Sequence, residues 1–469
     1  AAVLTLLQNG AKVNAQDEEG TTSLIYAAGK GNTAVIDILL KNGADVNAQE
    51  DDGWSALMYA AKFGNAGAVL GLLENSANVN ERNKEGITPL MYAALENSTV
   101  VVDILLKNGA NVNAHSNSGK TPLICAAKGG SRGVINTLVK NGADVNEQDN
   151  EGHSALMHAA NAGMPAAVLT LLQNGAKVNA QDEEGKTSLM YAAEGGSKAV
   201  IDILLKNGAD VNAQDGDGFS PLMYAAKFGK AEGVLGLLEN SANVNEQNKE
   251  GLTPLMYAAQ ENSTAVVDIL LKNGADVNAQ DWEGWSALMF ATKEGSTGVV
   301  AALLKVGAKV NAQDEDGWSP LIFAIDNGRA SVFETLVKNG ADVNVQDNEG
   351  RSALMHAAKE GMTAAVLTLL LNGAKVNAQD EEGKTSLMYA AEEGNTAVID
   401  ILLKNGANVN AKDGEGWSAL MYAAQKNSTA VVNTLVKNGA DSNAHSKAGT
   451  TPLMFAARGG SAAVIDILL

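Results

Sequence analysis

One asparagine recurs along the whole chain at a fixed interval of 33 residues, with no insertion or deletion between copies. Self-similarity at a period of roughly 20–50 residues is the sequence signature of repeat architectures. We therefore predict a single continuous array over residues 1–469, with a partial unit at 1–13 and a truncated last repeat. The repeats begin at Asn14, Asn47, Asn80, Asn113, Asn146, Asn179, Asn212, Asn245, Asn278, Asn311, Asn344, Asn377, Asn410 and Asn443.

The copy at residues 245–277, NEQNKEGLTPLMYAAQENSTAVVDILLKNGADV, has the pattern of a turn, a helix, a turn and a second helix. A polar turn ends at Gly251, and Thr253 stands where every copy has Ser or Thr, whose hydroxyl can cap a helix predicted over 253–260. Proline is tolerated at the first helical position. It follows the capping residue at Pro89, Pro122, Pro221, Pro254, Pro320 and Pro452.

A second helix is predicted over 264–272, after a Gly or Asn that suits the left-handed conformation of a helix end, Asn262 in this copy. One face of this helix is apolar at the i, i+3, i+4 spacing, with Val266, Val267, Leu270 and Leu271. A single helix pair is too small to bury its apolar face, whereas stacked neighbours bury one another's. The residues therefore predict a helical solenoid.

The run G-x-T-P-L, followed by Ala-Ala, a Gly turn and L-L-x-N-G-A-D-V-N, resembles the ankyrin repeat in length, order and spacing over essentially the whole chain. The resemblance implies an all-α helix-turn-helix solenoid with short β-hairpin or loop fingers. It also implies a non-catalytic scaffold that binds proteins through the concave surface of fingers and first helices. Ankyrin repeats usually carry His after T-P-L, but this chain has Met in eleven copies, and Ile at Ile25, Ile124 and Ile322. We expect apolar packing between repeats there.

The net charge of −20, with acidic residues clustered at the turn tips, argues against nucleic acid as a partner, because binding it requires a basic surface. No apolar run approaches the 18 residues of a membrane span, and the single cysteine, Cys125, excludes an internal disulfide framework. No targeting signal is present in this segment, so a cytoplasmic and an extracellular location both stay open. Because neither end has an atypical capping repeat, we expect the chain to be part of a longer array.

The most variable position of the repeat follows the turn glycine, and in ankyrin-like arrays this side of the turn faces partners. Trp and Phe there are candidate anchors, because Trp is frequent at interface hot spots. The alternative is that these rings only stack against the next turn. We expect partner contact at Trp54, Phe219, Trp282, Trp285, Trp318 and Trp417, with a patch that also includes Phe290, Phe323 and Phe333.

A second candidate surface lies on the second helix, where Leu replaces the Asp of copies such as Asp37. By helical register these leucines face solvent, which predicts either isolated exposed residues or lateral self-association. Self-association would favour the alternative function, a structural filament or spacer built from a longer array. The candidate residues are Leu70, Leu169, Leu235, Leu367 and Leu371, with Leu4 at the same position as the first four.

No catalytic, cofactor or metal site is predicted. Residues 215–218, Asp-Gly-Asp-Gly, lack the downstream acidic ligand of a calcium loop. His153 and His158 occur together in one copy, at positions that the repeat already explains. The Asn-Ser-Thr triplets that begin at Asn97, Asn262 and Asn427 match a glycan acceptor, but Asn there is better explained as a helix-ending residue.

Overall fold

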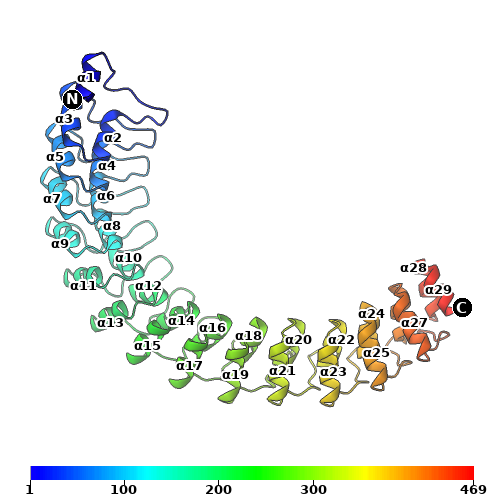
Figure 1. Cartoon of the computed structure of the whole chain (residues 1–469). Helices are drawn as coiled ribbons and strands as arrows, with labels where there is room; N and C mark the ends of the chain where they lie inside the picture. The colour runs from blue at the N-terminus through cyan, green and yellow to red at the C-terminus, as the bar shows by residue number, and fades with distance from the viewer. Residues whose placement is uncertain (1) are drawn as a thin grey trace. The chain divides into compact units, whose positions relative to one another are not determined.

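The computed structural model describes residues 2–469 and divides into two compact units, Ala1–Lys249 and Glu250–Leu469. Each unit is a row of antiparallel helix pairs joined by loops that project as fingers (Figure 1). The described residues contain 29 helices and no strand, which confirms an all-helical solenoid. The prediction of one continuous array concerns how the two units join, and it stays a prediction.

In the first unit, the first helix of each repeat lies beside the fingers. These helices are α2 (Ser23–Gly29), α4 (Ala56–Lys62), α6 (Pro89–Leu95), α8 (Pro122–Gly129), α10 (Ala155–Asn161), α12 (Ser188–Gly195) and α14 (Pro221–Lys227). The second helices are α1 (Ala2–Gln8), α3 (Thr33–Lys41), α5 (Ala66–Glu74), α7 (Thr99–Lys107), α9 (Arg132–Lys140), α11 (Pro165–Gln173), α13 (Lys198–Lys206) and α15 (Ala231–Glu239).

The second unit repeats this arrangement. Its first helices are α16 (Pro254–Gln260), α18 (Ala287–Glu294), α20 (Pro320–Asp326), α22 (Ala353–Lys359), α24 (Ser386–Glu393), α26 (Ala419–Gln425) and α28 (Pro452–Gly459). Its second helices are α17 (Thr264–Lys272), α19 (Thr297–Lys305), α21 (Ala330–Lys338), α23 (Thr363–Leu371), α25 (Thr396–Lys404), α27 (Thr429–Lys437) and α29 (Ala462–Leu468).

The first helices begin at the predicted hydroxyl caps. In α10, the Ser154 hydroxyl accepts the backbone N–H of Met157 at 3.3 Å, which satisfies one orphan donor of the first turn. The Met157 sulfur in turn accepts the N–H of Ser154 at 3.4 Å, and the same reciprocal pair recurs in other copies. Met therefore packs in the core, as expected, and its sulfur also accepts a hydrogen bond at the start of the helix, which was not predicted.

Inside each unit, first helices contact first helices and second helices contact second helices of the neighbouring repeats. The two alanines of the first helix, such as Ala60 and Ala61, are fully buried, and their small size allows this close approach. Leu57 beside them and Leu72 on the second helix are also buried. Burial of one such leucine stabilises the fold by about 1.5–3 kcal/mol, so stacking of the repeats supplies most of the stability.

Non-glycine residues take the left-handed conformation at two helix-ending positions. Ser76 and Ser241, which replace glycine after the second helix, have φ of 68° and 67°. At the end of the first helix, the Asn of all three Asn-Ser-Thr triplets has positive φ, 58° at Asn97. The structure therefore explains these asparagines as helix-ending residues.

The periodic asparagine joins one repeat to the next. In Asn179, the side-chain Nδ2 donates to the Gly208 carbonyl at 3.0 Å, and Oδ1 accepts the Asp210 N–H at 2.9 Å. Equivalent pairs recur along the chain, for example at Asn14 and Asn377. The strict 33-residue period thus reflects a side chain that bonds to the backbone of its neighbour.

Replacing Asn179 with alanine removes both inter-repeat hydrogen bonds, so we expect a loss of roughly 1–2 kcal/mol of local stability. Amide exchange at Asp210 reports this loss directly. Asn207 is a matched control, because its Nδ2 donates to Ile203 within its own repeat at 2.7 Å. Equal exchange at Asp210 in the two alanine variants would show that the asparagine does not couple the repeats.

The fingers are loops rather than regular hairpins. A single antiparallel bridge closes six of them, for example between Gln16 and Thr22, and the described residues form no longer ladder. The expected β-hairpin fingers are therefore not confirmed. None of the helices in residues 2–469 has the length and hydrophobicity that a membrane span needs.

Candidate interaction surface

In ten of the fourteen copies an acidic residue at the base of the finger organises the loop; the other four have Asn83, Ser116, Asn248 and Ser446. In the finger before α14, Asp215 Oδ1 accepts the backbone N–H groups of Asp217 and Phe219, both at 2.9 Å. Its other oxygen, Oδ2, accepts the Tyr224 hydroxyl from α14 at 2.6 Å. The carboxylate therefore closes the turn and ties it to the first helix, which accounts for the acidic run that resembles part of a calcium loop.

This contact between the finger and helix one was not predicted from the sequence, although the copies carry a signal for it. The two residues stand nine apart, and in seven of the fourteen copies they are Asp with Tyr or His. Ser takes the acidic position only at Ser116 and Ser446, opposite Cys125 and Phe455, which offer no comparable donor. Burial raises the pKa of the Cys125 thiol to about 11, as suits a packing residue.

Hydrogen bonding and burial change the acidity of both members of the pair. Burial, followed by the hydrogen bond to Glu50, raises the pKa of Tyr59 to about 12. In two copies Phe replaces Tyr and leaves the acid without its hydroxyl donor. There burial raises the pKa of Asp281 and Asp314, against the opposing effect of backbone N–H groups.

The tryptophans at the variable turn position lie between the aromatic rings of two consecutive first helices. The Trp54 ring centroid is 4.9 Å from that of Tyr59 in its own repeat and 4.3 Å from that of Tyr92 in the next. Trp417 is placed likewise, with Phe455 of the next repeat at 4.4 Å. These rings stack on the neighbouring repeat and remain partly exposed, so their structural role is shown and partner contact stays a prediction.

The aromatic patch expected around Trp285 is smaller than predicted. Trp285 and Trp318 are half-buried and each contacts Phe323, at 4.5 and 5.2 Å between ring centroids, while Trp282 is 62% exposed on a finger. Phe333 is buried on α21 instead, because its position faces the core of the second-helix row. Phe323 is also buried, at 5% exposure, so including Phe323 and Phe333 in a surface patch was wrong.

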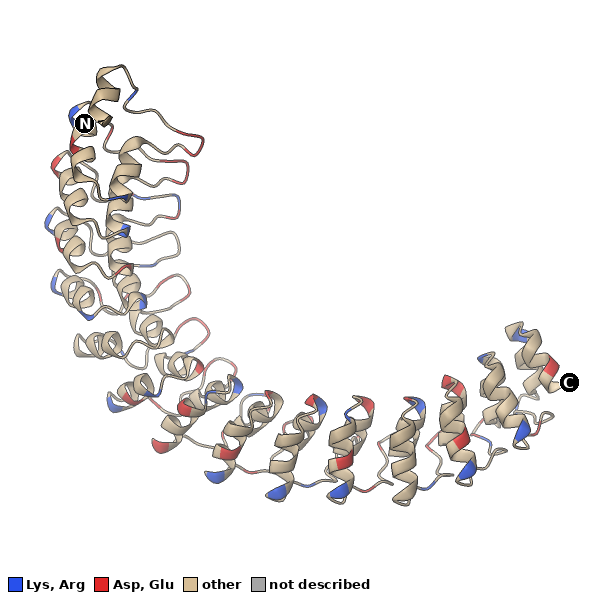
Figure 2. Cartoon of the chain, viewed as in Figure 1, with Lys and Arg blue, Asp and Glu red and all other residues tan. Residues whose placement is uncertain are grey.

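Acid-rimmed grooves with aromatic floors lie between fingers in each unit. One, of about 500 Å³, has Phe219 and Tyr224 at its floor and Glu183 and Glu184 on its rim. A second, of about 720 Å³, is built from the equivalent Trp417 and Tyr422, with a rim of Glu381, Glu382 and Glu415. The colouring of Figure 2 marks acidic residues along the fingers of both units, and basic residues at the ends of many second helices.

Each groove already holds a cation over its aromatic floor. Lys186 Nζ lies 5.2 Å from the centre of the Tyr224 ring, and Lys384 Nζ lies 5.3 Å from that of Tyr422. The ammonium groups also pair with Glu184 and Glu382 on the rims. Each groove therefore combines an aromatic face and a carboxylate around a cationic side chain of the chain itself.

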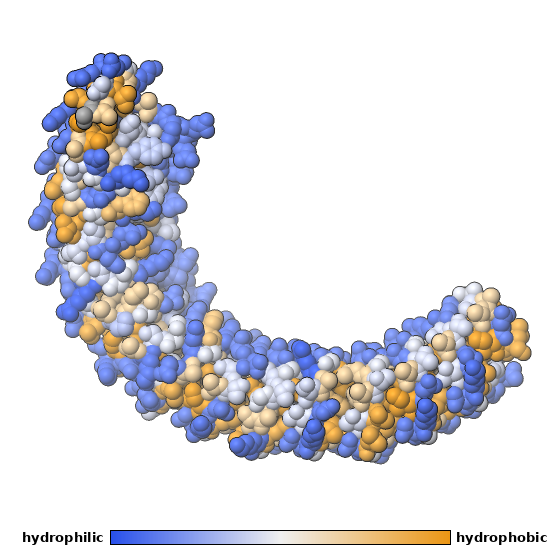
Figure 3. Space-filling model, viewed as in Figure 1, coloured by the Kyte–Doolittle hydropathy of each residue, from blue (hydrophilic) through white to orange (hydrophobic). Residues whose placement is uncertain are grey.

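The leucines on the second helices are exposed as expected, with one exception. Leu367 and Leu371, one turn apart on α23, are 45% and 77% exposed, and Leu70 and Leu169 are also exposed. Leu235 is only half-exposed. Figure 3 shows apolar side chains interspersed with hydrophilic ones along the second helices of both units.

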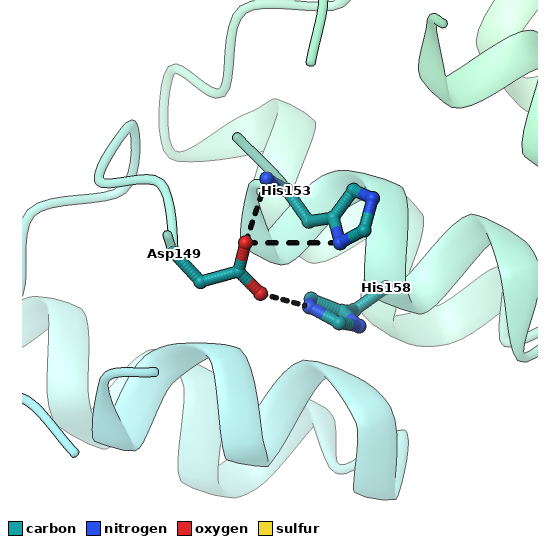
Figure 4. Close-up of side chains that lie close together, drawn as sticks. All are labelled: Asp149, His153 and His158. Carbon is teal, nitrogen blue, oxygen red and sulfur yellow. Dashed lines mark hydrogen bonds and ion pairs between the residues drawn. The ribbon is translucent and has the colours of Figure 1, made fainter. Parts of the chain in front are cut away.

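One repeat brings two histidines to the organising carboxylate. His158 Nε2 lies 3.0 Å from Asp149 Oδ2, and His153 Nδ1 lies 3.7 Å from Oδ1 of the same carboxylate (Figure 4). Burial would raise the pKa of Asp149, but the hydrogen bonds from His158 and the backbone hold it below its usual value. Burial lowers the pKa of His158, against the opposing hydrogen bond to Asp149. Sequence reasoning noted the two histidines but missed their shared carboxylate.

Comparison with known families agrees with this architecture. The family described as ankyrin repeats (3 copies) matches residues 1–83, 72–149, 134–215, 214–281, 279–347, 339–413 and 387–469. No curated protein matches the chain. Ankyrin repeats are generally protein-interaction modules, and ankyrin-repeat proteins are typically non-catalytic. The matched segments together span residues 1–469, so the chain belongs to the ankyrin-repeat family.

Proposed function

We propose that this protein is a non-catalytic scaffold that binds partner proteins through its fingers and first helices, the concave surface of an ankyrin array. The observation that carries this proposal is the pair of equivalent grooves at Phe219 and Trp417, with acidic rims and aromatic floors. Each floor holds a lysine of the chain itself, and we expect an arginine or lysine of a partner to displace that lysine from the ring. The preferred partner segments are therefore basic.

A peptide-display selection tests this proposal. Wild-type protein serves as bait for a random peptide library, and we expect the recovered peptides to be rich in Arg and Lys. Trp417→Ala together with Phe219→Ala removes one floor ring from each groove, and should weaken these peptides roughly tenfold or more, equivalent to about 1.4 kcal/mol. Binding should also fall as salt concentration rises.

The matched control is Leu367→Asn with Leu371→Asn on the second-helix face, which should leave peptide affinity unchanged. Circular dichroism of each variant checks that the helices are intact. Neutral or acidic peptides, or equal affinity for the groove and control variants, would refute the groove as the binding surface. Trp282→Ala with Trp285→Ala, assayed on the same peptides, tests the other candidate aromatic site.

We also propose a second function, lateral self-association into a filament or spacer, on a separate observation. Two leucines one turn apart, Leu367 and Leu371, expose an apolar strip on α23. Self-association would make light scattering rise with protein concentration, and Leu371→Asn would reduce it. Scattering that stays at the monomer value, or that is equal in both proteins, would exclude this strip as a contact between copies.

A further inference from the structure

The Asp149 cluster has an arrangement that the other fingers lack. His153 Nε2 lies 2.9 Å from the Tyr191 hydroxyl, which donates to Asp182 of the next finger at 2.6 Å. With that hydroxyl donating onward, His153 Nε2–H is the donor to Tyr191, and Nδ1 is the ring nitrogen that faces the Asp149 carboxylate. This Nδ1 lies 3.7 Å from an Asp149 oxygen and 3.3 Å from Glu151 Oε2. One imidazole nitrogen and two carboxylates therefore lie close together at this finger.

We propose that Asp149, His153 and His158 bind a divalent transition-metal ion of the zinc class. Their ligand atoms all lie within 4.8 Å of one another. Zinc binds His nitrogen and carboxylate oxygen at about 2.0–2.2 Å, which places tetrahedral ligand atoms about 3.4 Å apart. His158 Nε2 lies 3.0 Å from Asp149 Oδ2 and His153 Nδ1 lies 3.7 Å from Asp149 Oδ1, so the contacts at the two carboxylate oxygens lie on either side of this value.

The surroundings fit a metal site as well as the ligands do. The two imidazoles lie next to the Asp149 carboxylate (Figure 4). The Asp149 side chain is only 2% exposed, whereas the imidazoles are about one fifth exposed, so an ion can reach the carboxylate past them. Tyr191 and Asp182 hold the outer nitrogen of His153, the kind of contact that orients metal-bound histidines. Glu151, or a water molecule, completes four-fold coordination.

The chain contains its own comparison site, in which one ligand is missing. Asp347 and His356 reproduce the Asp–His contact at 3.0 Å. Arg351 stands where the first site has His153. It donates its Nε–H to Asp347 Oδ2 at 2.9 Å and pairs with Glu349 at 2.8 Å. A guanidinium is always protonated and cannot ligate a metal. The two sites therefore differ in metal-binding capacity by a single residue.

Zinc titration of the full chain by calorimetry, repeated with Co²⁺ to record its visible spectrum, tests the proposal. We expect one tight equivalent and a four-coordinate Co²⁺ spectrum in the wild type. His153→Arg recreates the arrangement at Asp347 and should weaken binding by more than the roughly 10–100-fold that outer-shell substitutions cause. Arg351→His recreates the Asp–His–His set and should add a second equivalent, because Asp380 and Tyr389 are paired there as Asp182 and Tyr191 are.

His158→Tyr restores the carboxylate–tyrosine contact of the other copies, so it should stay folded and lose the ion. Equal zinc affinity in the wild type, His153→Arg and His158→Tyr would overturn the proposal and assign binding to acidic surface residues. A missing second equivalent in Arg351→His would also overturn it, because the same donors would then be insufficient. These readouts involve no partner peptide, so they stand apart from the groove experiments.

Discussion

Replacing Gly284 with alanine should destabilise its repeat far more than the same change at Gly307. Both glycines have positive φ, 82° and 95°, which costs alanine roughly 1–2 kcal/mol. A Cβ on Gly284 would lie 2.9 Å from Asp314 Cα and 3.0 Å from Glu315 N, whereas nothing lies within 4 Å of one on Gly307. We expect a local loss of about 3 kcal/mol or more at Gly284 and about 1 kcal/mol at Gly307.

The collision at Gly284 is with backbone, so it cannot be relieved by a side-chain rotation. It would also disturb the bond from the Glu315 N–H to the Glu283 carbonyl, 3.0 Å long, that joins consecutive fingers. The copies of the repeat agree with this expectation. Every copy has glycine at the position of Gly284, whereas Ser76 and Ser241 stand at the position of Gly307.

Local amide exchange around residues 281–318 is the appropriate measurement for this pair, because repeat arrays need not unfold in a single step. The urea midpoint followed by circular dichroism gives a second readout. Similar exchange in Gly284→Ala and Gly307→Ala would show that the fingers do not pack as tightly as the structure indicates.

Alkaline pH should unfold the protein as its tyrosines ionise. The fold raises the pKa of seven tyrosines. For Tyr59 the pKa rises to about 12, mainly because of burial and to a smaller extent because of the hydrogen bond to Glu50. An unfolded tyrosine has a pKa of about 10. Between these values the unfolded chain has lost protons that the folded chain retains, so stability is complete below about pH 10 and falls as pH rises.

The expected observation is a single transition in which tyrosinate absorbance and loss of helical circular dichroism coincide above about pH 10. A variant with Phe at Tyr191, Tyr224, Tyr389 and Tyr422 is the control, because Phe290 and Phe323 show that the position accepts Phe. This variant should be less stable at neutral pH, since four carboxylates lose their donors, but should depend less on pH above 10. Tyrosinate formation near pH 10 with unchanged circular dichroism would contradict the raised pKa values.

The fold could be predicted in detail from the sequence because its determinants are local and repeated. The Ser or Thr cap, the apolar face of the second helix and the Gly or Asn at helix ends each act within a few residues. Their recurrence every 33 residues identifies the family without a structure. The exposure of Leu371 and the left-handed conformation of Asn97 followed from the same local rules.

The details of the candidate sites required the tertiary structure, because they depend on which residues of neighbouring helices and fingers meet. Position in the repeat did not show that Gly284 abuts the next finger while Gly307 is open. Phe333 differs, because it stands at the position of Val267 on the predicted apolar face, which already indicated the core. The sequence by itself determined the repeating unit, its helices and its family. Only the packing of finger against helix and repeat against repeat placed His153, His158 and Asp149 at one point. The spacing of these three residues along the chain follows neither the period of a helix nor that of a strand, so the sequence pattern alone did not bring them together.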